Sequence, residues 1–371
     1  MMNVTLLDID RDEKLIFQLY KELPDSSFFT SSAWLSNLLF ALSDHKRLFV
    51  VKVTDGKRIV AVFLAGFKND VFSWLIKRKS VVVNETGISR VDRALWIEYN
   101  DPFSLLKSDK DFYEFFETMP SRWDEICISC VPEEASLTKY VCSHFSENDA
   151  KSKFEVKTTK KSKCYYVDLE KVRSADNQII SLLSKNTRYQ VKRSYKEFGK
   201  HGKIQLNVAS TVDEALLFFN ELYGMHESIW YEKKLKSNFI NSFSYKFHNE
   251  LIKNRFEQQQ VQLIKVIFDE QIIGLLYNFV HERSVLFFQS AIPTNKSNNL
   301  KPGYISHIEA INYNASIGMR YYNFLVGNET YKKSLSTDFT SMYWFKFIRP
   351  NVRTKAERII KAIYHFNFKK N

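Results

Sequence analysis

Apolar runs separated by turn residues recur in the two halves of the chain in the pattern of a β-hairpin. In the first half, runs at 48–53 and 59–64 flank an Asp-Gly pair. In the second half, runs at 261–268 and 272–277 flank an Asp-Glu pair, and a further run at 284–290 extends the pattern. A short polar turn between two apolar runs is a strong hairpin signal. The repetition predicts two related domains, each built on antiparallel strands.

Apolar residues at helical spacing accompany these predicted strands. A helix over 213–223 is expected, with Thr211 as its N-cap and a glutamate three residues later, which is the capping-box pattern. A second helix over 303–316 ends before Gly318, a residue that commonly terminates helices, and a strand at 321–326 follows. Strands mixed with helices in this order are typical of an α+β (mixed α/β) architecture, with one mostly antiparallel mixed sheet per domain, flanked by helices.

Lysines interrupt the apolar pattern near 155–163 and mark the expected join between domains. We therefore predict an N-terminal domain at 1–160 and a second domain at 161–349. A basic helix over 178–198 is expected to open the second domain. Residues 350–371 are expected to form a basic C-terminal helix or tail.

The positive charge of the chain is concentrated in two places. Lys and Arg number 54 and Asp and Glu 42, a net charge of +12. Residues 151–203 carry net +10 and residues 346–371 net +7, whereas residues 1–150 carry net −5 and residues 204–345 are neutral. This distribution predicts local contacts with a phosphate-bearing partner, and disfavours a surface that coats nucleic acid.

Several features of the sequence predict a cytoplasmic protein without a membrane span. No stretch of about 18 uncharged apolar residues occurs, and acidic residues at 8–13 stand where the apolar region of a secretory signal would lie. Cys127, Cys130, Cys142 and His144 offer zinc-ligand types. Because the first two lie in an apolar run of strand character, we favour buried structural thiols and predict no metal.

Motifs for several enzyme classes are missing from the sequence. G-x-S-x-G, the Walker loop, G-x-G-x-x-G and H-E-x-x-H are all absent. What remains is a polar loop at 298–305 that opens a helix. Helix N-termini present unpaired N–H groups and can hold a pyrophosphate, although a Pro-Gly pair alone is more often an ordinary turn.

An ordered set of residues in the second half resembles the GNAT-type acyltransferases of cellulose and exopolysaccharide gene clusters, the CelD-like group, which is related to the FemAB aminoacyltransferases. The resemblance rests on Asn186-x-Arg188 with Lys192-Arg193, His226-x-x-x-Trp230, Ile273-Gly274, Ser290-Ala-Ile-Pro293, Lys301-Pro-Gly-Tyr304 and Phe324-Leu-Val-Gly-Asn-Glu-Thr-Tyr-Lys332. It covers about residues 164–345. Over residues 1–150 it is weaker, resting on 28–38, the first hairpin and 96–101.

The resemblance implies two GNAT-like domains in tandem and acyl transfer to an amine, from acyl-CoA or, in the FemAB branch, from aminoacyl-tRNA. In place of the usual Gln/Arg-x-x-Gly-x-Gly/Ala loop of GNAT proteins, the chain has Pro302-Gly303, as the CelD-like group commonly does. The expected donor-binding residues are Lys301, Gly303, Tyr304 and His307. No metal is expected, and acetyl-CoA or another acyl-CoA is the expected co-substrate.

Three residues near the end of the motif set are the expected catalytic group. Lys332 is expected to stabilise the oxyanion, Glu329 to accept the amine proton, and Tyr331 to protonate the leaving sulfur. The alternatives are a solvated carboxylate for Glu329 and a packing residue for Tyr331. Expected substrate contacts are Arg188, Lys192, Arg193, His226, Trp230, Glu98, Tyr99 and Asn100. For the basic residues the alternative is a solvated face, and for His226 and Trp230 it is a packing pair.

The sequence therefore predicts an N-acyltransferase that acts on an amine, with an amino sugar or another polysaccharide or envelope precursor as acceptor. One alternative is a FemAB-like transferase that uses charged tRNA. Another is a non-catalytic accessory protein of polysaccharide synthesis, with peripheral membrane contact through the basic tail. The acceptor and the acyl group are not encoded in any local motif.

Overall fold

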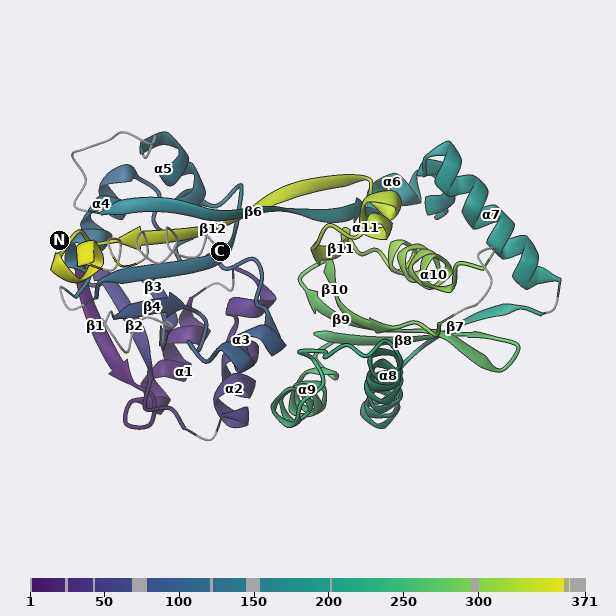
Figure 1. Ribbon diagram of the computed structural model, residues 1–371, viewed down its shortest axis with the longest axis horizontal. Helices are drawn as coiled ribbons and strands as arrows, with labels where there is room; N and C mark the ends of the chain where they lie inside the picture. The colour runs from purple at the N-terminus through teal and green to yellow at the C-terminus, as the bar shows by residue number, and fades with distance from the viewer. Residues whose placement is uncertain are drawn as a thin grey trace. The chain divides into compact units, whose positions relative to one another are not determined.

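The structure is a computed structural model that describes residues 2–23, 26–42, 44–68, 79–120, 123–144, 154–200, 202–294, 300–356 and 360. The chain forms two compact units, each a sheet with helices on it (Figure 1). Unit 1 comprises Met1–Lys161 and the stretch from Ser341 onward, and unit 2 comprises Ser162–Thr340. The first boundary lies next to the expected position, but unit 1 is made of two separate pieces of chain.

Unit 1 contains a mixed sheet in the order β1-β2-β3-β4-β5-β12, in which β4 and β5 are parallel and the other neighbours antiparallel. Its strands are β1 (Met2–Asp8), β2 (Leu48–Asp55), β3 (Arg58–Lys68), β4 (Ser80–Val83), β5 (Glu125–Pro132), the first part of β6 (Glu155–Asp168) and the last part of β12 (Asp338–Ile348). Its helices are α1 (Glu13–Glu22), η1 (Phe28–Thr30), α2 (Ser32–Ala41), α3 (Ser89–Leu95), α4 (Asp109–Thr118) and α5 (Ser136–His144). The hairpin predicted at 48–64 is β2 and β3.

Unit 2 contains a mixed sheet in the order β6-β11-β10-β9-β8-β7, in which β10 and β11 are parallel. Its further strands are β7 (Ile204–Val208), β8 (Val261–Phe268), β9 (Gln271–His281), β10 (Ser284–Ala291) and β11 (Tyr321–Val326). Its helices are α6 (Leu169–Arg173), η2 (Ile179–Leu182), α7 (Lys185–Gly199), α8 (Val212–Glu232), α9 (Ser242–Arg255), α10 (Pro302–Ser316) and α11 (Thr330–Leu335).

Several local predictions for unit 2 need correction in detail. The basic helix expected over 178–198 is divided, because Ser184 caps α7 by accepting the Thr187 N–H and so ends the preceding turn. The helix expected over 213–223 continues to Glu232. Thr211 caps it as predicted, but the Glu214 carboxylate accepts the N–H and O–H of Ser210 instead of returning to the cap residue.

The end of the chain also differs from the expected domain limits. β12 leaves unit 2 at Thr340, and its residues 342–348 pair with β5 in unit 1, so the second domain does not run to 349. The long-range pairing partner, which no local pattern encodes, sets this limit. Residues 352–356 are helical, while most of the expected tail lies outside the described residues.

The two units share one arrangement of strands. In each, a hairpin is followed by a strand that pairs in parallel with the next strand, over only three residue pairs. In unit 1 the pairs run from Ser80 with Glu125 to Val82 with Cys127; in unit 2 they run from Ser284 with Tyr321 to Leu286 with Asn323. Beyond these pairs the ladder between the two strands stops, which leaves backbone groups and side chains available at the same place in both units.

Each unit has its own apolar core. In unit 1 it is rich in aromatic side chains, such as Phe63, Phe103 and Phe115, which contact one another. In unit 2 a Cβ on Gly274 of β9 would lie 2.1 Å from Ser306 Oγ of α10, so a glycine allows this helix to pack closely on the sheet. Among the described residues, no helix has the length and apolar character needed to cross a membrane.

Candidate functional site

The candidate site lies at the end of β11 in unit 2. Asn323 Oδ1 accepts the Leu325 N–H at 2.8 Å, and Leu325 has φ +59°. This local turn interrupts the register between β11 and β6 from Asn323 to Val326. The interruption is a β-bulge-like irregularity that redirects the strand end, and it leads the chain into α11.

Lys332, in α11, is almost completely buried at 7% exposure. Its Nζ donates to the Val326 carbonyl oxygen at 2.8 Å and lies 3.5 Å from Glu329 Oε2. Burial of an ammonium is costly unless hydrogen bonds and an opposite charge compensate it, and both are present here. A Cβ on Gly327 would lie 2.0 Å from Glu329 Oε2 and 2.6 Å from Lys332 Nζ. A larger residue at this position would displace the ends of these two side chains.

An aromatic and imidazole stack borders the lysine. The Tyr331 ring stacks on His307 of α10, with centroids 5.2 Å apart and planes 14° apart. His307 Nδ1 is hydrogen-bonded to the Tyr322 hydroxyl at 3.1 Å. Burial, with a contribution from the charge of Lys332, lowers the pKa of His307 to about 3. His307 is therefore a neutral imidazole near pH 7.

Burial first, and then the charge of Glu329, raise the pKa of Tyr331 well above its ordinary value. The hydroxyl consequently keeps its proton near neutral pH, which is the protonation state that a proton donor needs. Glu329 itself is exposed at the start of α11, with 57% of its side chain accessible. The structure thus brings together the three expected catalytic residues and one expected donor-binding residue, His307.

The other expected donor-binding residues lie at the start of α10. The Lys301 N–H donates to Ser194 Oγ of α7 at 3.0 Å, so the two helices meet there. A Cβ on Gly303 would meet only Ile292 side-chain atoms at 3.7 Å or more, an ordinary contact, so packing does not require this glycine. Tyr304 is half-buried against the core of unit 2.

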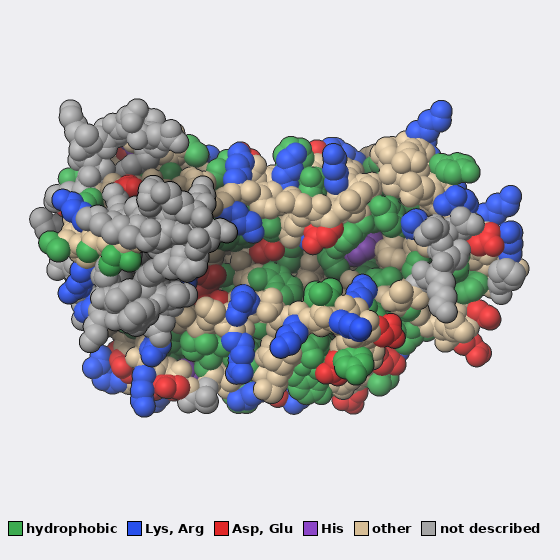
Figure 2. Space-filling model, in the orientation of Figure 1, with side chains coloured by type: hydrophobic (Ala, Val, Ile, Leu, Met, Phe, Trp, Pro, Cys, Tyr) green, Lys and Arg blue, Asp and Glu red, His purple; other side chains and the backbone are tan. Residues whose placement is uncertain are grey.

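The expected basic substrate contacts on α7 divide into two kinds. Figure 2 shows Lys and Arg side chains gathered over this helix. Arg188 Nη2 donates to the carbonyl oxygens of Ser181 and Leu183, so its guanidinium supports the preceding turn. Lys192 is exposed, and half-buried Arg193 lies over the Tyr189 ring at 5.9 Å.

His226 and Trp230 form the packing pair that the sequence left as an alternative. Their rings stack at 5.5 Å and 22°. His226 Nδ1 lies 3.2 Å from the Ser290 carbonyl oxygen, which can only accept, and Nε2 lies 3.0 Å from Ser237 Oγ. Burial lowers the pKa of His226. The ring is neutral and joins α8 to β10 just beyond the irregularity at Phe287 and Gln289.

Glu98, Tyr99 and Asn100 belong to unit 1. Glu98 is buried, and Tyr99 has φ +52°. Asn100 is fully buried, where its Nδ2 donates to the Val83 carbonyl oxygen and its Oδ1 accepts from Asn84 Nδ2, both at 2.9 Å. In this position the Asn100 side chain supports the end of β4.

Sequence reasoning missed Tyr322 and Val326 as parts of the site. Tyr322 could have been found from the alternation of β11, which directs this residue and Phe324 toward the same core. The role of the Val326 carbonyl has no sequence signal, because it arises from the bend at Leu325. None of the four cysteines is in a disulfide, and no group of three or more metal-ligating side chains occurs among the residues that the structure describes.

We compared the chain with family models, curated proteins and solved structures to ask which family it resembles. Residues 185–333 match the family model of the acetyltransferase (GNAT) domain. A comparison with curated proteins found no match. Among solved structures, FemX has 9% sequence identity and a TM-score of 0.55, covering 94% of this chain and 98% of FemX. This likeness concerns the fold alone.

Two further solved structures are similar over nearly the whole chain, with lower scores. L-PGS from Bacillus licheniformis has 10% identity and a TM-score of 0.47, covering 96% of this chain and 97% of that one. A tandem GNAT protein from the clavulanic acid biosynthesis pathway has 10% identity and a TM-score of 0.41, covering 95% and 99%. The expected mixed α/β class is confirmed, the two units share one strand arrangement, and the residues that match the acetyltransferase (GNAT) domain model lie within unit 2.

Proposed function

We propose that the protein is an N-acyltransferase in which unit 2 transfers an acyl group from acyl-CoA to an amine. The observation that carries this proposal is the buried Lys332 ammonium, held by the Val326 carbonyl and Glu329 at the end of β11. The proposed acceptor is an amino sugar or another polysaccharide or envelope precursor, in line with the CelD-like resemblance of the sequence.

Lys332 would stabilise the oxyanion that forms at the acyl carbonyl. An ammonium has three N–H donors. Among the described residues, two of these donors are directed to Val326 and Glu329. The third is left for a substrate oxygen. A fixed donor in such a position is worth about 2.7–4 kcal/mol of transition-state stabilisation.

Proton transfers would fall to Glu329 and Tyr331. The amine nitrogen bonds to the carbonyl carbon, the C–S bond breaks, and the Glu329 carboxylate takes the amine proton. Tyr331, which keeps its hydroxyl proton near neutral pH, gives it to the leaving thiolate. Proton exchange with solvent through exposed Glu329 restores both groups, so no covalent enzyme intermediate is needed.

The start of α10 would bind the donor phosphates. Its free N–H groups and partial positive charge favour an anion, and α7 adjoins it through the bond from Lys301 to Ser194. Lys192 and Arg193 would add positive charge there, whereas Arg188 supports the fold. His307 would fix the Tyr331 ring by stacking on it.

The test is turnover by the full-length protein with acetyl-CoA and a panel of amines that includes glucosamine, measured as released thiol. Lys332→Ala should fold and lose about 100-fold or more in kcat. Lys333→Ala is the matched control, because that lysine is exposed on the same helix. A folded wild-type protein that neither binds acyl-CoA in calorimetry nor acylates any amine would overturn the proposal.

A second candidate is aminoacyl transfer from charged tRNA, which the FemX-like fold and the net +10 segment favour. Phosphate contacts make nucleic-acid affinity fall steeply with salt. Titration of aminoacyl-tRNA at 50 and 200 mM salt would show such a fall if this candidate holds, and a flat response would exclude it.

A further inference from the structure

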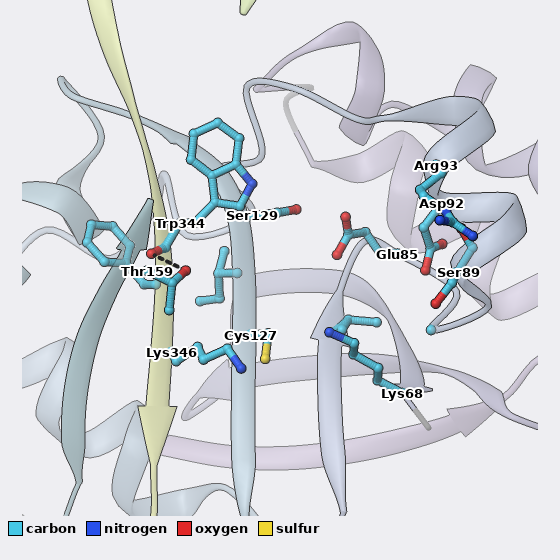
Figure 3. Close-up of a pocket in the computed structure, with 14 residues that line it drawn as sticks. Lys68, Glu85, Ser89, Asp92, Arg93, Cys127, Ser129, Thr159, Trp344 and Lys346 are labelled. Atoms are coloured by element: carbon cyan, nitrogen blue, oxygen red, sulfur yellow. Dashed lines mark hydrogen bonds between the residues drawn. The ribbon is translucent and has the colours of Figure 1, made fainter. Parts of the chain in front are cut away.

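A cavity of about 420 Å³ lies wholly within unit 1, beyond the last paired residues of β4 and β5. Its volume is in the range of small-molecule sites. Figure 3 shows the Glu85 carboxylate between Ser129 of β5 and Asp92 of α3. Lys68 of β3 and Trp344 of β12 also line the cavity. Strands β3, β5 and β12, helix α3 and the loop after β4 thus supply one set of side chains.

The fold holds Glu85 in a fixed place. The residue before it, Asn84, exchanges two hydrogen bonds with Leu64 of β3, through its backbone N–H and its side-chain oxygen. After it, Gly87 passes so close to β3 that a Cβ would lie 2.3 Å from the Phe67 carbonyl oxygen. A Cβ on Gly66 would likewise lie 2.3 Å from the Thr86 backbone. Such preorganisation is what a binding site requires.

Two carboxylates, Glu85 and Asp92, face each other in the cavity. Asp92 belongs to α3, and its Oδ1 accepts the N–H and O–H of Thr86 at 2.8 and 2.7 Å. Lys68 is the cation whose charge acts on both carboxylates. Arg93 Nε donates to the Ser89 carbonyl oxygen, farther along α3.

Two further cations line the cavity: Arg93, whose side chain is exposed, and Lys346, which is paired with another acid. Lys346 Nζ lies 3.2 Å from Glu125 Oε1, on a side chain with 1% exposure. Cys127 Sγ donates to the same oxygen at 3.1 Å, and burial raises the pKa of this thiol. Lys346 therefore balances Glu125, whereas the charge of Lys68 acts on the two carboxylates of the cavity.

The protonation of Glu85 reflects its burial and the neighbouring carboxylate of Asp92. Burial first, and then the charge of Asp92, raise its pKa from 4.5 to about 7, against the opposing effects of Ser129 and Lys68. Burial likewise raises the pKa of Asp92. A cation that entered the cavity would favour the ionised form of Glu85 and displace its proton.

We propose that this cavity binds a small polar molecule with a primary ammonium group, of the size of an amino sugar, with the ammonium beside Glu85 and Asp92 and a ring face on Trp344. Trp344 lines the cavity, and an indole ring can pack against the apolar face of a sugar ring. The ligand's hydroxyl groups would meet Ser129 and Thr159, which also line the cavity. This binding is a property of unit 1 and does not rest on the acyl transfer proposed for unit 2.

Calorimetry on the full-length protein without an acyl donor tests the proposal, with glucosamine, N-acetylglucosamine and glucose as probes at pH 7. Glucosamine should bind at least about tenfold more tightly than the two neutral sugars, because only it presents a cation to Glu85 and Asp92. Glu85→Gln should remove this preference. Glu114→Gln, the same change on α4 outside the cavity, should keep it.

Proton release provides a measurement that needs no variant. At a pH near the pKa of Glu85, binding of the ammonium should release up to roughly half a proton, seen as a dependence of the heat on the buffer. Affinity should fall as the pH drops from 7 to 5.5. Equal affinity for the three sugars, no glucosamine binding, or binding without proton release would each overturn the proposal, whatever the activity of unit 2.

Discussion

The two units place opposite chemistry at the same point of a shared strand arrangement. In each, a hairpin leads into a parallel pair that lasts three residues. Beyond the pair in unit 1 lie two carboxylates, Glu85 and Asp92, and the charge of Lys68 acts on both. Beyond the pair in unit 2 lies a buried ammonium, Lys332, with neutral His307 and protonated Tyr331 beside it.

In both units a site forms where two parallel strands separate. The residues that follow the strands differ between the units, and they determine the chemistry of each site. In unit 1 the loop after the shorter strand, β4, carries the ionisable group. In unit 2 the helix after β11 carries it. The same separation of strands can therefore form a site for an amine in one unit and for an oxyanion in the other.

The strongest test of the unit 2 assignment is Gly327→Ala. The added methyl would occupy the space between Glu329 and Lys332, and should separate them or turn the lysine away. We expect kcat to fall about 100-fold, since the donor to the oxyanion is misplaced. Gly224→Ala in α8, where a Cβ meets nothing within 4 Å, is the matched control and should keep full activity. Equal activity of both variants would contradict the close fit of Glu329 and Lys332 against Gly327.

The corresponding test in unit 1 is Gly66→Ala, which affects stability. Its Cβ would lie 2.3 Å from the Thr86 backbone, which cannot move without displacing the loop that carries Glu85. We expect a loss of about 1–3 kcal/mol, measured by denaturant unfolding. Gly199→Ala, at a position with open space, should change stability by less than about 1 kcal/mol. If Gly66→Ala proved neutral, the loop would be less fixed than described.

Acidification should affect the two units in opposite directions. In unit 2, burial lowers the pKa of His248 and of His307 to about 3, below the ordinary 6.5, so the unfolded chain binds protons first as the pH falls. Their contribution to stability is present above pH 6.5 and is lost between 6.5 and 3, at up to about 1.4 kcal/mol per pH unit for each histidine.

In unit 1, Glu85 has a raised folded-state pKa of about 7, so the folded protein holds the proton that the unfolded chain has lost above pH 4.5. The contribution of Glu85 to the free energy of unfolding therefore rises as the pH falls from 7 to 4.5. Hydrogen exchange of peptides from each unit at pH 7 and 5 measures both effects. Equal loss of protection in the two units would contradict these assignments.

The smallest expected effect is on the KM for acyl-CoA, and it tests whether the unit 2 site extends to α7. Lys192 is exposed on α7, so Lys192→Ala should leave stability unchanged but raise the KM for acyl-CoA a few-fold at low salt. Lys253→Ala on α9, a surface lysine paired with Glu250, is the control and should leave the KM unchanged. If both variants behave alike, α7 does not contact the donor.

The parts of the fold that depend on neighbouring residues could be predicted from the sequence. Both hairpins, the cap at Thr211 and the helix that begins at Pro302 follow from periodicity and turn chemistry. The break before α7 was missed, because Ser184 in an otherwise helical pattern gives only a weak signal. The end of the second domain was misplaced, since it depends on the pairing of β12 with β5.

The two sites differ in how much of each the sequence could predict. Glu329, Tyr331 and Lys332 stand together in one motif, so the resemblance could identify them as a group. Glu85 and Asp92 lie seven residues apart and are joined locally through Thr86, but long-range packing in unit 1 brings Trp344 to them, and no motif in the sequence links the three. Asn100, which the sequence did select, does not line the cavity but accepts a hydrogen bond from Asn84, the residue before Glu85.

The late position of β12 in the chain bears on how the protein is made. β5 pairs with β4 on one side and with residues 342–348 on the other, and these are synthesised after the whole of unit 2. As the nascent chain emerges, the second unit has all of β7 to β11 before the first can close its sheet. Until then β5 presents an unpaired edge, a ready template for association with other chains. A chain truncated after Thr340 should therefore aggregate instead of yielding a shorter folded protein.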